Sequence, residues 1–188
     1  MTILRWQPGV TLAPPVYLDA NIVVGYVVRN HPLYKKSVEL LGHLLTQRCQ
    51  LQISLLAVEE SLWAIARLSY FELANQPSTA LFSQGAFERW RDRIFAAHGD
   101  RFDAVGSMFE DLKNAGVQID IVPNQTTDWT KVIRSTTKYI RQLKLTPADA
   151  AHLAVAEACA KTIATGDSDI VNAANLAGIS GLTVLHVV

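Results

Sequence analysis

The sequence has few cysteines, no excess of charge of either sign and no long apolar run. Its two cysteines among 188 residues, Cys49 and Cys159, are too few for a disulfide framework and do not have metal-ligand spacing. This usage suggests a reducing compartment, so we expect a cytoplasmic protein. Lysine plus arginine and aspartate plus glutamate each number 17. Any anionic partner must therefore be met by a local patch, because the net charge is zero.

Membrane segments are not expected. No apolar stretch approaches the ~18 residues that a membrane-spanning helix needs. The first ten residues, M-T-I-L-R-W-Q-P-G-V, lack the charged leader and apolar run of a signal peptide. Hydrophobic residues make up 49% of the chain and charged residues 18%, which is typical of a folded globular protein. We therefore expect no membrane partner.

Hydrophobic patterns alternate between short strands and longer helices. The pattern predicts strands at 16–18, 51–54, 117–122, 162–165 and 182–187, and helices at about 21–29, 33–48, 56–73, 127–143, 146–161 and 169–176. This alternation implies crossover connections and an α/β/α sandwich around a mainly parallel sheet of about five strands. Residues up to Pro15 are expected to form an irregular arm. The block 79–115 predicts two helices with Gly99 and Asp100 between them. We interpret it as a helical elaboration of one domain, 1–188.

Acidic residues follow several of the predicted strands. Asp19 comes directly after V-Y-L, and Asp167 follows T-I-A-T with one residue between. The pair Glu59 and Glu60 lies early in the helix after the second strand, and Asp149 lies in the first turn of its own helix. Ligands of open parallel sheets gather outside the carboxyl ends of the strands. Clustered carboxylates there would form a hard oxygen site for Mg²⁺ or Mn²⁺, suited to in-line displacement at a phosphodiester.

Each acid also has a purely structural interpretation. Asp19 could cap the helix that follows it, and Asp167 could cap the helix near residue 170. Asp149, in T-P-A-D, could serve only its own helix through a capping box. Glu60 lies off the apolar face of its helix, where an ordinary solvated glutamate would lie. His152, one turn after Asp149, is expected to be a packed helix residue and not a ligand. The four acids in this order are what favour a site.

Four segments together carry a family resemblance: L-D-A-N-I, I-S-L-L-A-V-E-E-S-L-W, L-T-P-A-D-A-A-H-L-A-V-A and T-G-D-S-D-I. The series resembles the PIN-domain ribonucleases, and in style is closest to the VapC-type toxins of toxin–antitoxin pairs. The resemblance covers about residues 15–73 and 117–188. It implies catalytic and metal-binding roles for Asp19, Glu60, Asp149 and Asp167. It adds Asp169 as an auxiliary metal ligand and Asn21 and Thr165 as supporting residues. Glu59 replaces Glu60 if the register shifts by one.

The resemblance also implies a function. A PIN-like chain would be a metal-dependent endoribonuclease with Mg²⁺ or Mn²⁺ as cofactor and RNA as substrate, leaving a 5′-phosphate and a 3′-hydroxyl. A toxin of this kind would have a small antitoxin partner and form a homodimer. The alternatives are a stand-alone RNA-processing nuclease and a non-catalytic PIN-like binding module. A phosphatase of the haloacid dehalogenase type would need D-x-D, which D-A-N lacks.

Two further surfaces are predicted. The helix 127–143 places four cations on one stripe, either a phosphate track or an ordinary solvated face: Lys131, Arg134, Lys138 and Arg141. The block 79–115 carries more large apolar residues than two amphipathic helices need on one face: Leu81, Phe82, Phe87, Trp90, Ile94, Phe95, Phe102 and Phe109. We expect part of this block to pack against a second copy or a partner, the alternative being burial within the monomer.

Overall fold

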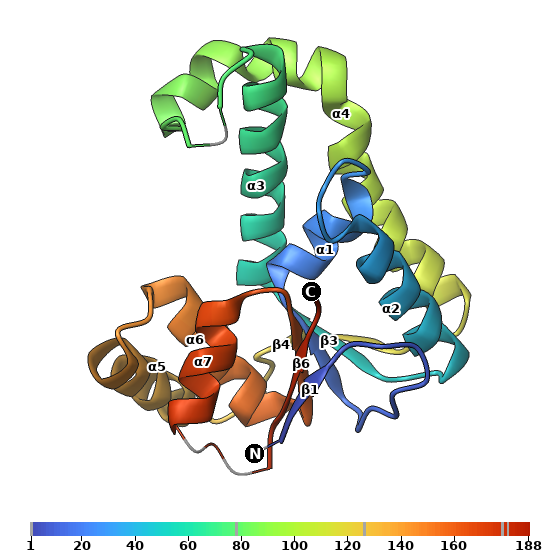
Figure 1. Ribbon diagram of the computed structural model, residues 1–188, viewed down its shortest axis with the longest axis vertical. Helices are drawn as coiled ribbons and strands as arrows, with labels where there is room; N and C mark the ends of the chain where they lie inside the picture. The colour runs from blue at the N-terminus through green and yellow to red at the C-terminus, as the bar shows by residue number, and fades with distance from the viewer. Residues whose placement is uncertain (1, 78, 126, 178, 180) are drawn as a thin grey trace.

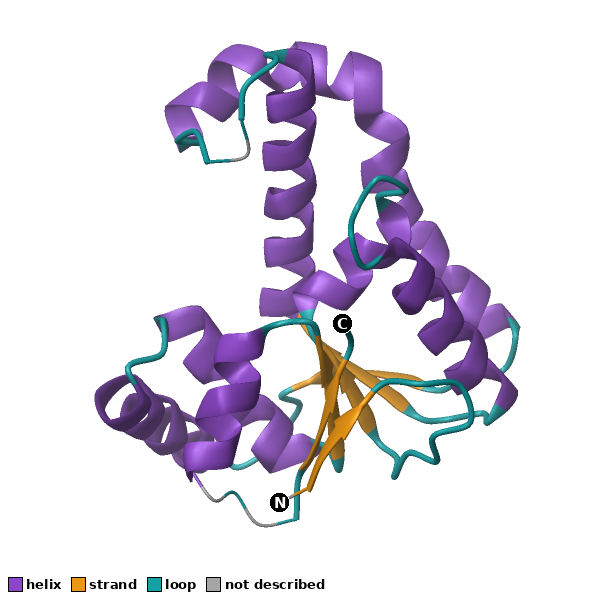
Figure 2. Ribbon diagram, in the orientation of Figure 1, coloured by secondary structure: helices purple, strands orange, loops and turns teal. Residues whose placement is uncertain are grey.

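A single sheet of parallel strands forms the centre of the molecule (Figure 2). The computed structural model describes residues 2–77, 79–125, 127–177, 179 and 181–188. Within these residues the sheet has six strands in the order β1-β6-β5-β2-β3-β4, and every neighbouring pair is parallel. The strands are β1 (Thr2–Arg5), β2 (Val16–Leu18), β3 (Leu51–Ser54), β4 (Ile119–Val122), β5 (Thr162–Thr165) and β6 (Thr183–His186).

Helices cover both faces of this sheet. One layer contains α1 (Ala20–Val27), α2 (Tyr34–Thr46), α3 (Leu55–Leu73) and α4 (Gln84–Asn114). The other contains α5 (Trp129–Leu143), α6 (Pro147–Cys159) and α7 (Ser168–Ala177) (Figure 1). The α/β/α sandwich predicted from the sequence is therefore confirmed. Among the helices that the structure describes, none is both long and apolar enough to cross a bilayer.

The sheet has one strand more than the five expected. Residues Thr2–Arg5, predicted to be part of an irregular arm, pair with Thr183–His186 as the edge strand β1. This strand is mostly exposed, so its short sequence carries none of the buried alternation that marks β2 or β3. The backbone of β1 pairs with β6 on one side, at the edge of the sheet. Because its side chains do not alternate between buried and exposed, the hydrophobic pattern of the sequence does not reveal the strand.

Helix caps keep the connections after the strands short. Asp19, directly after β2, is the N-cap of α1 and accepts a hydrogen bond from the backbone N–H of Ala20. Ser54, the last residue of β3, is the N-cap of α3. Thr146, in the loop between α5 and α6, caps α6, with Pro147 at its first position, where proline costs no hydrogen bond. The chain therefore turns into a helix at the carboxyl edge of the sheet, and the acids remain at that edge.

Neighbouring side chains of β2 pack into opposite halves of the core. Leu18 lies in the cluster under α1 to α4, whereas Tyr17 lies in the cluster under α5, α6 and α7. Both are fully buried. β2 lies between β3 and β5, while the chain reaches β3 next and β5 only after β4. This reversal of direction is a topological switch point, where such sheets bind ligands.

The block 79–115 forms two helical segments that meet at a kink. Both carry the label α4 (Gln84–Asn114), but His98 between them, with φ −139° and ψ 22°, is not helical, so the two helices predicted there are confirmed, with the break one residue before Gly99. The first half of α4 packs beside the outer half of α3, and together they project beyond the sheet (Figure 1). This projection comprises residues 66–98.

Aromatic side chains fill the contact between α3 and the first half of α4. Phe82 lies 5.1 Å from Trp63 and 5.2 Å from Tyr70, measured between ring centroids, and Trp90 lies 5.5 Å from Tyr70. Much of the apolar surface of the block is thus used within the monomer. Leu81 and Phe95 are the exceptions, at 94% and 45% exposed, and packing against a second copy stays a prediction.

Candidate functional site

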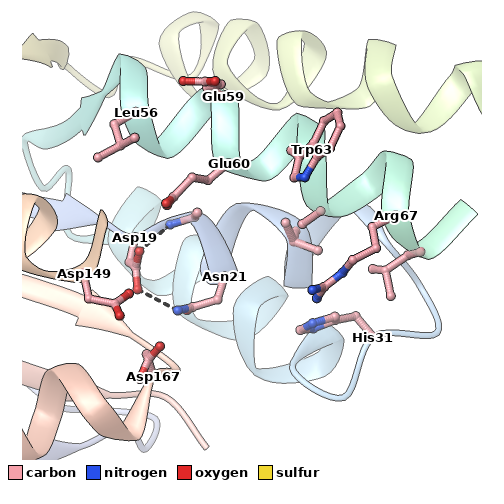
Figure 3. A pocket seen from close by; sticks show the side chains of 14 residues that line it. Asp19, Asn21, His31, Leu56, Glu59, Glu60, Trp63, Arg67, Asp149 and Asp167 are labelled. Carbon is pink, nitrogen blue, oxygen red and sulfur yellow. Dashed lines mark hydrogen bonds between the residues drawn. The ribbon is translucent and has the colours of Figure 1, made fainter. Parts of the chain in front are cut away.

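An open cavity of about 640 Å³ lies at the carboxyl edge of the sheet, bounded by α1, α3 and the starts of α6 and α7. Figure 3 shows the acids that line it, with Asp19 close to the centre of the group. The lining includes five of the sequence-predicted site residues: Asp19, Asn21, Glu60, Asp149 and Asp167. They come from four separate crossover connections, which the parallel sheet brings to one edge.

Asp19 is the most buried of these acids, with 3% of its surface exposed. Its carboxylate accepts hydrogen bonds from the Ala20 N–H at 2.7 Å, the Asn21 Nδ2 at 2.6 Å and the Thr165 hydroxyl at 2.6 Å. Burial raises the pKa of Asp19, and the charge of His152 and the hydrogen bonds from Thr165 and the Ala20 N–H oppose the rise. The β2–β5 register sets the geometry, because Leu18 pairs with Ala164 and the next residues on each strand are therefore neighbours. Both supporting residues predicted from the sequence thus contact Asp19.

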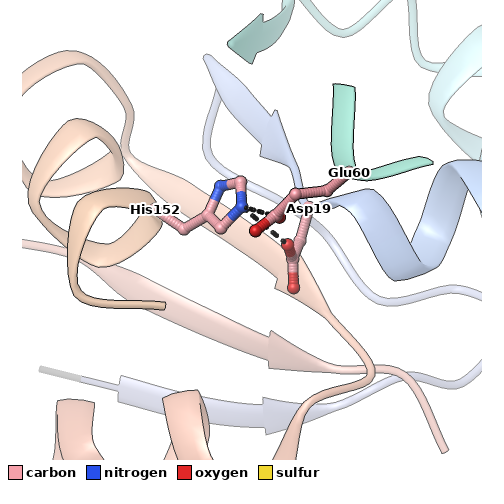
Figure 4. A group of neighbouring side chains, drawn as sticks. All are labelled: Asp19, Glu60 and His152. Atoms are coloured by element: carbon pink, nitrogen blue, oxygen red, sulfur yellow. Dashed lines mark hydrogen bonds and ion pairs between the residues drawn. The ribbon is translucent and has the colours of Figure 1, made fainter. Parts of the chain in front are cut away.

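Glu60 and His152 complete a compact group with Asp19 (Figure 4). The Nε2 of His152 lies 2.5 Å from Glu60 Oε2 and 3.8 Å from Asp19 Oδ1. One ligand atom from each of the three residues lies within 4.8 Å of the others, so the group could hold a metal ion. In Figure 3 the Glu60 carboxylate points toward Asp19, whereas that of Glu59 points away. The geometry therefore favours Glu60 over the alternative register.

His152 is held from its other side by a buried tyrosine. Tyr17 Oη lies 2.6 Å from His152 Nδ1 and 2.7 Å from the Ser54 hydroxyl. Burial raises the pKa of Tyr17, so its hydroxyl stays protonated. Burial alone would lower the pKa of His152, but the hydrogen bond to Glu60 and the charge of Asp19 raise it above its ordinary value. Where the Glu60 carboxylate is ionised it can only accept, so the Nε2 of His152 is the donor in this contact, and His152 could serve as a metal ligand only after losing that proton.

Asp149 and Asp167 line the same cavity and also cap their own helices. Asp149 serves its own helix, as the structural alternative predicted: its N–H donates to Thr146 Oγ1 at 3.2 Å, and its carboxylate accepts from the Thr146 hydroxyl at 2.6 Å. Asp167 accepts from the N–H groups of Asp169 and Ile170 at the start of α7. The two roles are compatible, since each carboxylate has several acceptor positions. The charge of Asp167 acts to raise the pKa of Asp19, and that of Asp149 acts to raise the pKa of His152.

Other predicted site residues lie elsewhere. Asp169 is outside the lining of the main cavity and borders a neighbouring one of about 270 Å³ between α6 and α7, which shares Asp149 with the main cavity. The cationic stripe of α5 borders a third cavity of about 520 Å³, lined by Arg134, Lys138 and Arg141 but not Lys131. It shares no residue with the acidic cavity. The α5 helix packs on α6 and α7 and lies farther from the sheet than they do (Figure 1).

His152 is the site residue that the sequence interpretation missed. It was expected to be a packed helix residue, and with 1% of its surface exposed it is one. It nevertheless contacts both Glu60 and Asp19. Its spacing of three residues from Asp149 was the available signal, because residues three apart lie on the same face of a helix. An alanine-rich surrounding sequence hides the signal, since every face of α6 looks apolar.

Comparison with known proteins adds no assignment. A scan of protein-family models found no match to the chain, and a search of curated proteins found no match either. The function must therefore be argued from the geometry of the cavity.

Proposed function

We propose that the protein is a metal-dependent endoribonuclease of PIN-like type. The observation that carries the proposal is the convergence of Asp19, Glu60, Asp149 and Asp167 on one open cavity at the carboxyl edge of a parallel sheet. A cluster of carboxylates at this edge, with one member almost fully buried, is costly to fold unless a cation or protons offset its charge. Such a cluster is consistent with a site shaped by function.

The donor set fits a divalent cation of the hard type. The carboxylates of Asp19 and Glu60, with Asp149 and Asp167 nearby, offer the oxygen ligands that Mg²⁺ and Mn²⁺ prefer. A bound cation would offset the repulsion between the acids and a phosphodiester and stabilise the charge that develops on the oxygens of the reacting phosphate. Mg²⁺ or Mn²⁺ is thus the proposed cofactor.

The residues around these acids would hold the ligands in place. Asn21 and Thr165 fix the Asp19 carboxylate from two directions, and the Gly166 N–H in turn donates to Asn21 Oδ1 at 2.7 Å. His152 positions Glu60 through its Nε2–H. A Cβ at position 166 would press on the end of the Leu33 side chain and lie 3.2 Å from Asn21 Oδ1 and 3.3 Å from the Val187 carbonyl oxygen, so a larger residue there would have to displace Leu33 and crowd Asn21. Hydrogen bonds to metal-ligating side chains commonly set the orientation of the ligands and the affinity for the metal ion.

The proposal is tested by the variants Asp19→Asn and Asp149→Asn. Each keeps the shape of the side chain but removes the charge that binds a hard cation, so each should abolish cleavage of RNA in Mg²⁺ or Mn²⁺. EDTA should do the same to the wild type, and added cation should restore activity. Circular dichroism would verify that the variants fold. The matched control is Asp103→Asn, an exposed residue on α4, which should cleave normally. Cleavage that survives both chelation and Asp19→Asn would reject the proposal.

A toxin role is the narrower form of the same proposal. It requires a small antitoxin that binds the chain and suppresses cleavage, and a stand-alone nuclease requires none. A short reading frame for a DNA-binding protein directly upstream of the gene would favour the toxin. A chain that is active, stable and harmless when expressed alone would favour the stand-alone enzyme.

A further inference from the structure

The acidic cavity extends along one face of α3 beyond the acids, to Trp63 and Arg67. Glu60, Trp63 and Arg67 are spaced by three and four residues, so they lie on the same helical face. Seven residues of helix separate Glu60 from Arg67 by about 10 Å along the axis. The cavity therefore has two ends, one acidic and one carrying an indole and a guanidinium.

Trp63 is held on one side and open on the other. Its ring centroid lies 5.1 Å from that of Phe82 and 5.7 Å from that of Phe87, both in or just before α4. Nevertheless 42% of its surface is exposed, and it lines the cavity. An aromatic ring that is fixed by its neighbours and exposed to an open cavity is a ready stacking surface for a nucleobase.

Arg67 has no partner among the residues that the structure describes. No hydrogen bond or ion pair of its guanidinium occurs there, in contrast to Arg101, which pairs with Glu72. Figure 3 shows the side chain extending from α3 toward His31, which lines the same end of the cavity. Of the lysines and arginines in the described chain, Arg67 alone borders this cavity. A free guanidinium in this position is suited to a phosphate.

We propose that Trp63 and Arg67 form a nucleotide subsite that binds single-stranded RNA beside the reacting phosphodiester, Trp63 by stacking on a base and Arg67 by pairing with a phosphate. This inference rests on the proposed function and names its substrate class. Single strands fit because a base must leave its stack to lie on an indole. The α5 stripe is not part of this path, since it borders a different cavity.

Binding is measured first, in an Asp19→Asn background that does not cleave. The probe is a fluorescein-labelled RNA of about 12 nucleotides of mixed sequence, used single-stranded and as a duplex in Mg²⁺. The Trp63→Ala change should weaken single-strand binding by roughly 5- to 150-fold, and Trp63→Phe should retain most of it. The Arg67→Gln change should weaken binding and reduce the slope of log Kd against log salt by about 0.7. The duplex should bind more weakly than the single strand.

Matched controls separate this subsite from general surface effects. Trp129→Ala removes another exposed tryptophan, on α5, and Arg91→Gln removes an exposed arginine on α4; both should leave binding unchanged. Loss of binding in Arg134→Gln, with none in Arg67→Gln, would move the RNA path to α5 and overturn the inference. So would equal binding by Trp63→Ala and Trp63→Phe.

Kinetics in the wild-type background distinguish failure of the subsite from failure of the proposed function. The Arg67→Gln and Trp63→Phe enzymes should raise KM for RNA more than they lower kcat, because neither residue touches the metal ligands. A wild type that binds RNA through this subsite but never cleaves it rejects the nuclease and keeps the inference. A wild type that cleaves with KM unaffected by both substitutions keeps the nuclease and rejects the inference. Failure of the Asp19→Asn chain to bind single-stranded RNA at all rejects the subsite.

Discussion

Thr165→Val tests whether the hydrogen bonds around Asp19 or the packing of β5 determine stability at the site. The Thr165 side chain is fully buried at the end of β5. Its hydroxyl donates to Asp19 Oδ2 at 2.6 Å and accepts from the Asp167 N–H at 2.9 Å. Valine has the same shape, so no cavity forms and only hydrogen bonding is lost. Thr165→Ser is the complementary change, because it keeps the hydroxyl and removes a methyl group.

The two substitutions have different expected magnitudes. A hydrogen bond to an ionised acceptor contributes about 1.5–3 kcal/mol, and an additional loss at the partly exposed Asp167 N–H brings the expected cost of Thr165→Val to about 2–4 kcal/mol. Thr165→Ser should cost only about 0.5–1.5 kcal/mol for one buried methyl group. With a melting temperature shift of about 2–4 °C per kcal/mol for a chain of this size, the valine variant should melt about 4–16 °C below the wild type.

The measurement is urea and thermal unfolding in EDTA at several alkaline pH values, because burial raises the pKa of Asp19 and the ionised carboxylate is the form whose hydrogen bonds are tested. Valine is the better strand former and fills the site, so a packing-dominated site would give the opposite order of stability. The reasoning fails if Thr165→Val is as stable as Thr165→Ser or more stable. A divalent cation should also bind Thr165→Val more weakly. Loss of this donor raises the pKa of Asp19 further, so a proton competes more strongly with the cation for the carboxylate.

Three other predictions follow from neighbouring contacts. Tyr17→Phe should destabilise the fold by about 1–2 kcal/mol in denaturant titrations and weaken metal binding, because His152 and Ser54 lose their shared partner; an unchanged midpoint would contradict this. In NMR titrations without metal, His152 should have a pKa above and His31 below the ordinary 6.5; the stabilisation from His152 is present below that value and is lost as pH rises through its raised pKa. Phe95→Glu should abolish any dimer seen by light scattering; a dimer that persists would place the interface elsewhere.

The sequence predicts the fold well where a buried hydrophobic pattern and the residues that end a strand or cap a helix indicate the same bounds. The strands 51–54 and 162–165 are fully buried. The first ends at Ser54, which caps the next helix, and the second ends before Gly166, so their observed bounds match the expected ones. Strand β1 escapes prediction because an exposed edge strand has no burial pattern. The break expected at Gly99 and Asp100 is found one residue earlier, at His98, where the backbone is not helical.

The site is predicted less completely than the fold. Strand-end position identifies Asp19 and Asp167, since it follows from chain connectivity alone. Glu60 and Asp149 depend on helix phase, and the family resemblance supplies what periodicity leaves open between Glu59 and Glu60. The role of His152 depends on a contact across 92 positions with Glu60. The residues next to His152 in the sequence do not indicate that it contacts Glu60.

The order in which the strands enter the sheet also sets the time at which the site can exist. Asp19 emerges early in synthesis, but its hydrogen bond to Thr165 spans 146 positions, and β5 enters the sheet between β2 and β6. At about 5–20 residues per second, the ribosome needs roughly 7–30 s to produce that interval. Until then the carboxylates have no common cavity. The acidic cavity of a growing chain therefore cannot be complete before β5 has been made and has paired with β2.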